Sequence, residues 1–234
     1  MLSVLRGAHQ RWCAPFVVSV YLGVAAALVF AYQALLPRAE LDFVFLRWAA
    51  IPLEVLEQDL EPATPLHPAV TLLTSLFLHG GLVHLLSNLL FLAAFGPPVE
   101  RKLGHLLTLV LYLAAGAAGG LVQASTTPTS LLPLIGASGA IASLLGAYVV
   151  VGRAHVLRTP LLLLWLGWQV WEVWAMTDAP LAAAQWLAGT AVWSHLTGFV
   201  MGVVCAAMWR LAASAQPWAR TVRRRGQTVE GSVA

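Results

Sequence analysis

Charged residues are scarce in this chain. Of its 234 residues, 10% are Asp, Glu, Lys or Arg and 59% are hydrophobic, whereas an ordinary soluble domain has about 25% charged and roughly 45–50% apolar residues. The 13 basic and 10 acidic side chains are too few to cover a soluble globule of this size. The composition therefore excludes a water-soluble domain and indicates that the lipid bilayer is the solvent.

Cysteine is rarer still, since the chain contains only Cys13 and Cys205. Two cysteines so far apart give neither a disulfide framework nor the spacing of a metal site. The histidines have no cysteine or carboxylate neighbours that would complete a metal site. We therefore expect packing roles for both cysteines, no metal and no cofactor.

Long uncharged runs fill most of the chain. They cover residues 12–37, 62–99, 103–152, 159–171 and 179–209. A membrane-spanning helix needs about 20 apolar residues. The polar, proline-containing turn at 123–130 divides the longest run into spans three and four. Gly80-Gly81 divides the run 62–99 into a re-entrant or interfacial segment at 70–79 and span two at 82–99.

The Trp-rich segment 159–176 is the weakest span because Glu172 lies inside it. Counting it, the pattern predicts an all-α integral membrane protein with six transmembrane helices. The first run is too long for the apolar region of a signal peptide, which favours an uncleaved first span. We find no internal repeat and no second domain.

The positions of the basic residues predict the orientation. Cytoplasmic loops collect Lys and Arg, and six spans place eleven of the 13 on one side, leaving Arg38 and Arg47 in the long first loop. We therefore expect a cytoplasmic segment at 1–15, a membrane domain at 16–213 and a basic cytoplasmic tail at 214–234. The run Arg223-Arg224-Arg225 is typical of topology or lipid contact rather than nucleic-acid binding. The excess of Arg over Lys favours a bacterial plasma membrane.

A few polar residues lie inside the predicted spans, where they are costly and where function is the default hypothesis. His84 and Asn88 are four residues apart on one helix face, and His79 precedes Gly80-Gly81. Span four opens with Gly136-Ala-Ser138-Gly139, and span six carries Ser194-His195. Taken alone, Ser138 fits a helix N-cap or a small packing residue, and His195 fits a structural hydrogen bond between helices.

The joint placement of these residues favours a functional site. His84, Asn88 and Ser138 lie in the first turns of helices that begin on the outer side, and His195 enters from that side too. Span four, from Ser138 to Gly152, is about 22 Å long, which is shorter than a hydrocarbon core of about 30 Å. Irregular backbone at membrane depth is tolerated where it lines a wet cavity. We therefore expect Ser138 at the floor of a water-filled pocket.

These residues carry the chemistry of acyl transfer. His195 is the best-placed base for the Ser138 nucleophile. Gly136 and Gly139 allow a tight turn, and the helix start favours a developing anion. Asn88, His84 and the Ser138 backbone N–H are candidate oxyanion donors. The one carboxylate at comparable depth, Glu172, is predicted nearer the outer end of span five, so we infer a Ser–His dyad rather than a triad.

At this point the chain resembles the rhomboid family of intramembrane serine proteases. The resemblance runs through His79-Gly-Gly-Leu-Val-His84-Leu-Leu-Ser-Asn88, Phe95-Gly96, Val99-Glu100-Arg101-Lys102-Leu103-Gly104, Gly136-Ala-Ser138-Gly139 and His195-Leu-Thr-Gly198-Phe-Val-Met-Gly202, and covers Leu72 to Gly202. It implies a Ser138 nucleophile, a His195 base, and His84 and Asn88 around the oxyanion. It also implies that the substrates are single-span membrane proteins, cut near the outer end of their helix.

The resemblance further implies that Gly198 and Gly202 pack span six closely against span four. The long first loop would be embedded in the membrane, and span five would be a lateral gate. Two positions depart from the family pattern. Val70-Thr71 stand where many members have Trp-Arg, so the anchoring of the first loop is expected to differ. Ala142 replaces a Tyr that stacks on the base, so we expect weaker restraint of His195, with another group, such as a tryptophan of span five, orienting it.

Two other functions fit part of the pattern. An inert relative that binds membrane clients would keep the fold, although such proteins typically lose the nucleophile or the base. A small proton-coupled transporter would use His84, His195 and Glu172 as a relay. The transporter gives no role to the Gly136–Gly139 turn. The sequence identifies neither the natural substrate nor the oligomeric state.

Overall fold

The computed structural model describes residues 16–57, 66–178 and 191–215. The predicted segment 1–15, Cys13 and nearly all of the predicted tail 214–234 lie outside these residues. The described part is all-helical. Its elements are α2 (Val17–Leu35), α3 (Arg38–Trp48), α4 (Pro52–Leu56), α5 (Pro68–Thr74), the 3-10 helix η1 (Ser75–Phe77), α6 (Leu82–Leu103), α7 (His105–Thr126), α8 (Ser138–Val151), α9 (Arg158–Asp178) and α11 (Val192–Ala215).

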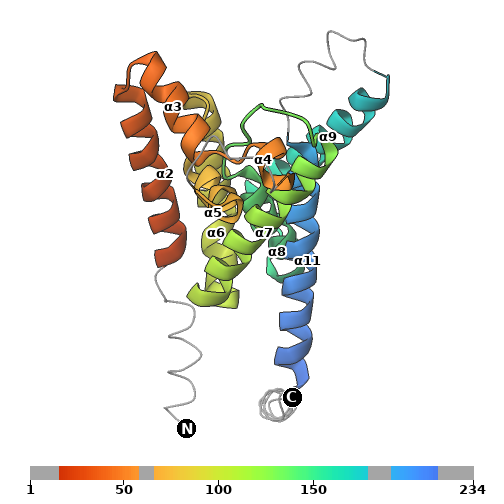
Figure 1. The fold of residues 1–234 in the computed structure, drawn as a ribbon. Coiled ribbons are helices and arrows are strands. Elements are labelled where there is room, and N and C mark those ends of the chain that lie inside the picture. Colours follow the sequence, from red (N-terminus) through yellow and green to blue (C-terminus); the bar gives the residue numbers. More distant parts are fainter. Residues whose placement is uncertain (1–15, 58–65, 179–190, 216–234) are drawn as a thin grey trace, which may run out of the picture.

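Four of the described helices, α2, α6, α7 and α11, are long and apolar enough to cross a membrane. The helix α8 has only 14 residues, and α9, with 21 residues, carries Arg158, Glu172 and Asp178. The structure thus confirms a helical chain built to span a bilayer, while the count of six spans stays a prediction. In Figure 1, the start of α2, the junction of α6 with α7 and the end of α11 lie on the same side.

The helix α6 extends four residues beyond its predicted end at Val99, because the carboxylate of Glu100 is buried and paired. Its two oxygens accept hydrogen bonds from the backbone N–H groups of Val18 and Ser19, at 2.8 and 2.9 Å, and from Ser19 Oγ at 2.6 Å. His105 Nδ1 lies 2.6 Å from the same carboxylate. Glu100 therefore caps the free N–H groups at the start of α2.

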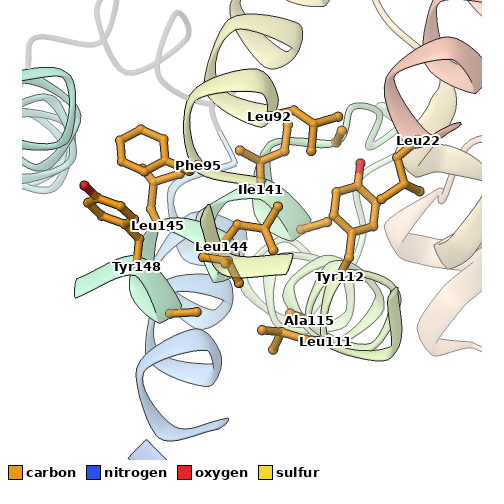
Figure 2. Packing of buried hydrophobic residues seen from close by; sticks show 14 of the residues in the cluster. Leu22, Leu92, Phe95, Leu111, Tyr112, Ala115, Ile141, Leu144, Leu145 and Tyr148 are labelled. Carbon is orange, nitrogen blue, oxygen red and sulfur yellow. The ribbon is translucent and has the colours of Figure 1, made fainter. Parts of the chain in front are cut away.

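The core of the molecule is centred on α8. Ten of its 14 residues are buried, and Leu144 and Leu145 are fully enclosed. Figure 2 shows these side chains packed with others from α2, α6 and α7, among them Leu92, Phe95 and Tyr112. A short helix surrounded in this way has few atoms left for contact with lipid.

Glycines bring the backbones of α8 and α11 into contact. A Cβ atom added to Gly198 would overlap the carbonyl oxygen of Gly139, and one added to Gly202 would overlap that of Ser143. From the other side, a Cβ at Gly146 would overlap the carbonyl oxygen of Phe199. This glycine seam, formed by Gly139, Gly146, Gly198 and Gly202, fixes the distance between the two helices.

The described part of the first loop is tied to the connection between α7 and α8. Ala50 and Leu134 exchange two backbone hydrogen bonds, of 3.3 and 2.8 Å. The side chain of Gln33 exchanges two bonds of 3.2 Å with the backbone of His79. The segment 70–79, predicted to be re-entrant or interfacial, forms α5 and η1. Its immersion in the membrane stays a prediction.

Candidate active site

Ser138 and His195 meet across the glycine seam. Ser138 is the first residue of α8, and His195 lies one turn into α11. Ser138 Oγ lies 2.8 Å from His195 Nε2, within hydrogen-bond distance. Ala137, not Ser138, occupies the N-cap position, and the cap makes no side-chain hydrogen bond. The interpretation of Ser138 as a helix cap is therefore wrong.

A cavity of about 610 Å³ lies beside this pair. Its lining comes from α6, α8, α9 and α11 and includes His84, Ser87, Asn88, Ser138, Trp165, Gln169, Glu172 and His195. Small-molecule and peptide sites are commonly cavities of this size, with a few polar groups set in apolar walls. The serine hydroxyl is thus at the wall of a largely apolar cavity that has a few polar groups.

The turn before Ser138 requires glycine. Gly136 has φ +109°, a left-handed conformation that side chains rarely adopt. Its backbone N–H donates to the carbonyl of Ser75 at 2.9 Å. A Cβ atom here would lie 2.7 Å from the imidazole ring of His84. The absence of a side chain lets the His84 ring approach the start of α8.

The predicted oxyanion residues lie on the α6 wall of the cavity. The side-chain amide of Asn88 donates to the backbone carbonyl of His84 at 3.0 Å. The rings of His84 and His79 make an edge contact with centroids 5.1 Å apart. Nδ1 of His79 lies 3.1 Å from the carbonyl of Phe77. The structure therefore brings His84 and Asn88 to the Ser138 pocket and places His79 behind them.

Gln169 and Glu172 of α9 reach the far side of the base. Nδ1 of His195 lies 3.0 Å from Gln169 Oε1 and 3.1 Å from Gln169 Nε2. Gln169 Nε2 donates to Glu172 Oε2 at 2.7 Å. The sequence analysis missed Gln169 and left Glu172 outside the site. Gln169 and Glu172 are three positions apart in an apolar helix and so share one face, a pattern that indicates a functional pair.

With Ala142 in place of a tyrosine, another group was expected to contact His195, and Gln169 lies within hydrogen-bond distance of it. The hydrogen bond comes from Gln169, not from a tryptophan. Trp165 does lie close, with its ring centroid 6.2 Å from that of His195. In the described part of the chain, no three His, Cys, Asp or Glu residues are grouped to hold a metal ion. The chemistry that these side chains offer is proton transfer from a serine to a histidine.

Comparison with known proteins gives consistent matches. A family model described as the Rhomboid domain matches residues 67–211. The chain is 37% identical over 76 residues to RHOMBOID-like protein 5 of Arabidopsis thaliana, covering 32% of this chain and 25% of that protein. It is 43% identical over 84 residues to Rhomboid protease GluP of Bacillus subtilis, covering 36% and 16%. It is 35% identical over 100 residues to Inactive rhomboid protein 1 of Drosophila melanogaster, covering 40% and 7%. The aligned segments thus span a quarter or less of these three relatives.

Proposed function

Because the chain belongs to the rhomboid family, we propose that it is an intramembrane serine endopeptidase with a Ser138–His195 catalytic pair. The observation that carries this proposal is the 2.8 Å contact between Ser138 Oγ and His195 Nε2 at the wall of a cavity that also holds Asn88 and His84. A serine becomes a nucleophile when an adjacent base takes its proton. Both partners come from helices held together by backbone contact.

The proposed reaction has two halves. His195 Nε2 takes the Ser138 proton while Oγ attacks the peptide carbonyl, giving a tetrahedral oxyanion. His195 then returns the proton to the leaving amine, and the C–N bond breaks to leave an acyl ester on Ser138. Water, deprotonated by His195, hydrolyses the ester and restores the serine. Asn88, His84 and the Ser138 backbone N–H stabilise the oxyanion in both halves.

The substrates proposed are single-span membrane proteins, cut near the outer end of their helix. The topology proposed has six spans, with α8 and α9 crossing beside α2, α6, α7 and α11, and with both termini in the cytoplasm. The cavity then opens to the outer side, where α6 and α8 begin. We propose a bacterial plasma membrane as the location, on the strength of the arginine-rich loops.

A fluorophosphonate serine probe tests the proposal directly. The intact protein in detergent is expected to be labelled, and Ser138→Ala and His195→Ala are expected to lose labelling. Ser143→Ala is the matched control, because Ser143 lies on the same helix, is fully buried and donates to Ala140 O at 2.6 Å. Its labelling should match that of the intact chain.

A second candidate function is an inert client-binding protein, favoured by the 35% identity to Inactive rhomboid protein 1 of Drosophila melanogaster. It predicts a folded chain that the probe does not label. In that case, the fold must first be verified by thermal unfolding in the same detergent. Equal labelling of the intact protein and Ser138→Ala would also refute the protease.

A further inference from the structure

We propose that Gln169 and Glu172 are positioning residues that hold His195 in the one neutral tautomer able to take the Ser138 proton. This inference rests on the proposed protease function and deepens it. Neither residue touches Ser138, and both act through the base.

The position of the ring proton decides whether His195 can act as the base. A neutral histidine carries one N–H, so one ring nitrogen donates while the other accepts. Nε2 of His195 faces Ser138 Oγ and must accept its proton. The ring proton must then sit on Nδ1, and it needs an acceptor. Which nitrogen is protonated is commonly set by the hydrogen bond made by the other.

The orientation of the Gln169 amide decides which tautomer of His195 is favoured. Both of its ends lie within reach of Nδ1, with Oε1 at 3.0 Å and Nε2 at 3.1 Å. Oε1 accepts from a protonated Nδ1 and so selects the productive tautomer. If the NH₂ group were turned to Nδ1, it would donate instead and favour the tautomer with the proton on Nε2. That tautomer cannot accept from Ser138. A glutamine without a further partner would therefore allow both neutral tautomers of His195.

Glu172 favours one of the two orientations of the Gln169 amide. An ionised carboxylate only accepts hydrogen bonds, and Glu172 Oε2 lies 2.7 Å from Gln169 Nε2. One N–H of the amide is therefore held toward Glu172 by a contact shorter than the 3.1 Å between Nε2 and Nδ1, which favours Oε1, at 3.0 Å, as the acceptor for Nδ1. Both side chains are almost fully buried, at 2% and 1% exposure. Burying a carboxylate is expensive, and the Gln169 amide is one of the groups that Glu172 contacts.

The arrangement differs from a Ser-His-Asp triad in one respect. In a triad, a carboxylate contacts the imidazole directly, and its replacement by an amide leaves the wrong tautomer and lowers the rate about 10⁴-fold. Here an amide already stands in that place, and Glu172 controls which way it faces. The negative charge of Glu172 acts on His195 through a neutral group, so the effect of removing it is expected to be smaller.

The decisive variant is Gln169→Met, which keeps the length of the side chain and removes the acceptor. The matched control is Val170→Met, because Val170 is the next residue of α9 and is 70% exposed. Probe labelling by Gln169→Met should slow by roughly 10- to 100-fold, a part of what general-base catalysis contributes. Labelling by Val170→Met should stay within about twofold of the intact chain, since rotation by one residue turns the side chain away from the site.

Histidine ¹⁵N spectra give a readout that does not depend on activity. The signals of His195 are assigned by their absence in His195→Ala. The intact protein is expected to show a ring protonated on Nδ1, and Gln169→Met a mixture of tautomers. Glu172→Gln keeps the shape and can still accept, but it also donates, so it should give an intermediate mixture and an intermediate labelling rate.

The outcomes separate the two proposals. An unlabelled intact chain would refute the protease, while the ¹⁵N spectra would still report on the tautomer. If the intact chain is labelled and Gln169→Met matches it in both rate and spectrum, the positioning role is refuted although the protease stands. If Gln169→Met fails to fold, Glu172→Gln decides, because a spectrum and a rate equal to those of the intact chain refute the role of the carboxylate.

Discussion

Adding one methyl group to the glycine seam should separate the nucleophile from its base. A Cβ at Gly202 would lie 2.7 Å from the Ser143 carbonyl carbon and 2.9 Å from the Ala147 nitrogen, and closer still to the Ser143 oxygen. Ordinary contacts of a Cβ atom begin at 3.4 Å. All three neighbours are backbone atoms of α8, which cannot rotate away. The oxygen is the nearest of the three and sets the displacement, so in Gly202→Ala the helix α11 must move off α8 by more than about 1 Å.

That displacement is enough to break the contact between Ser138 and His195. Ser138 Oγ and His195 Nε2 are 2.8 Å apart, so a shift of about 1 Å along the line between them lengthens the separation to about 3.8 Å, beyond a good hydrogen bond. Forcing an extra methyl group into a packed core costs about 1–3 kcal/mol. A misplacement of about 1 Å at a reacting pair can lower the rate by about 10²-fold. We expect both effects in Gly202→Ala.

The assay pairs thermal unfolding in detergent with the rate of fluorophosphonate labelling. The control is Gly167→Ala in α9, where an added Cβ meets nothing within 4 Å. This variant should unfold at or above the temperature of the intact chain, because alanine favours a helix over glycine by about 1 kcal/mol. Equal unfolding temperatures and labelling rates for the two variants would refute the claim that backbone contact sets the spacing of the pair.

Three further predictions follow from other contacts. Gly136→Ala combines a φ of +109° with a Cβ 2.7 Å from the His84 ring, so we expect slower labelling and a loss of about 1–3 kcal/mol in stability, measured by thermal unfolding. Glu100→Gln replaces an acceptor of N–H groups by an amide that also donates, so it should cost about 1–3 kcal/mol. Its labelling at low temperature should be unchanged, because Glu100 lies about 24 Å along α6 from His84. Ala142→Tyr introduces the aromatic ring that many members of the family carry at this position, but Ala142 is 1% exposed. The variant should therefore unfold at a lower temperature and be labelled no faster than the intact chain. Faster labelling at an unchanged unfolding temperature would indicate that the missing ring leaves His195 weakly held.

Much of the architecture could be predicted from the distribution of charge alone. Uncharged runs located the apolar helices, because a bilayer has no place for unpaired charges. The turn at 123–130 separated α7 from α8. The predicted span ends at Val99 because the uncharged run stops there, whereas the helix α6 continues to Leu103. Nothing local to that segment indicates that Glu100 caps a helix 81 residues earlier in the chain.

The candidate site was predictable where several polar residues share a motif, and hidden where one contact joins distant helices. Ser138, His195, His84 and Asn88 stand out because each is polar within an apolar helix. Gln169 is also polar, but the third member of a Ser-His site is usually a carboxylate, and Gln169 is an amide. Its contact with His195 depends on how α9 and α11 cross, because the two residues are 26 positions apart and their side chains approach to 3.0 Å. A local sequence pattern does not predict how two helices cross.

The short length of α8 determines how deep Ser138 lies in the membrane in the proposed reaction. A helix of 14 residues is about 21 Å long, about 9 Å less than the hydrocarbon core. With the Arg153 end of α8 held at the cytoplasmic boundary, Ser138 lies about 9 Å beneath the opposite one. A substrate helix would have to bring a bond about six residues deep to that level, but an unwound strand would reach it with about three. Lengthening or shortening α8 should therefore shift the cut along the substrate, rather than only slow it.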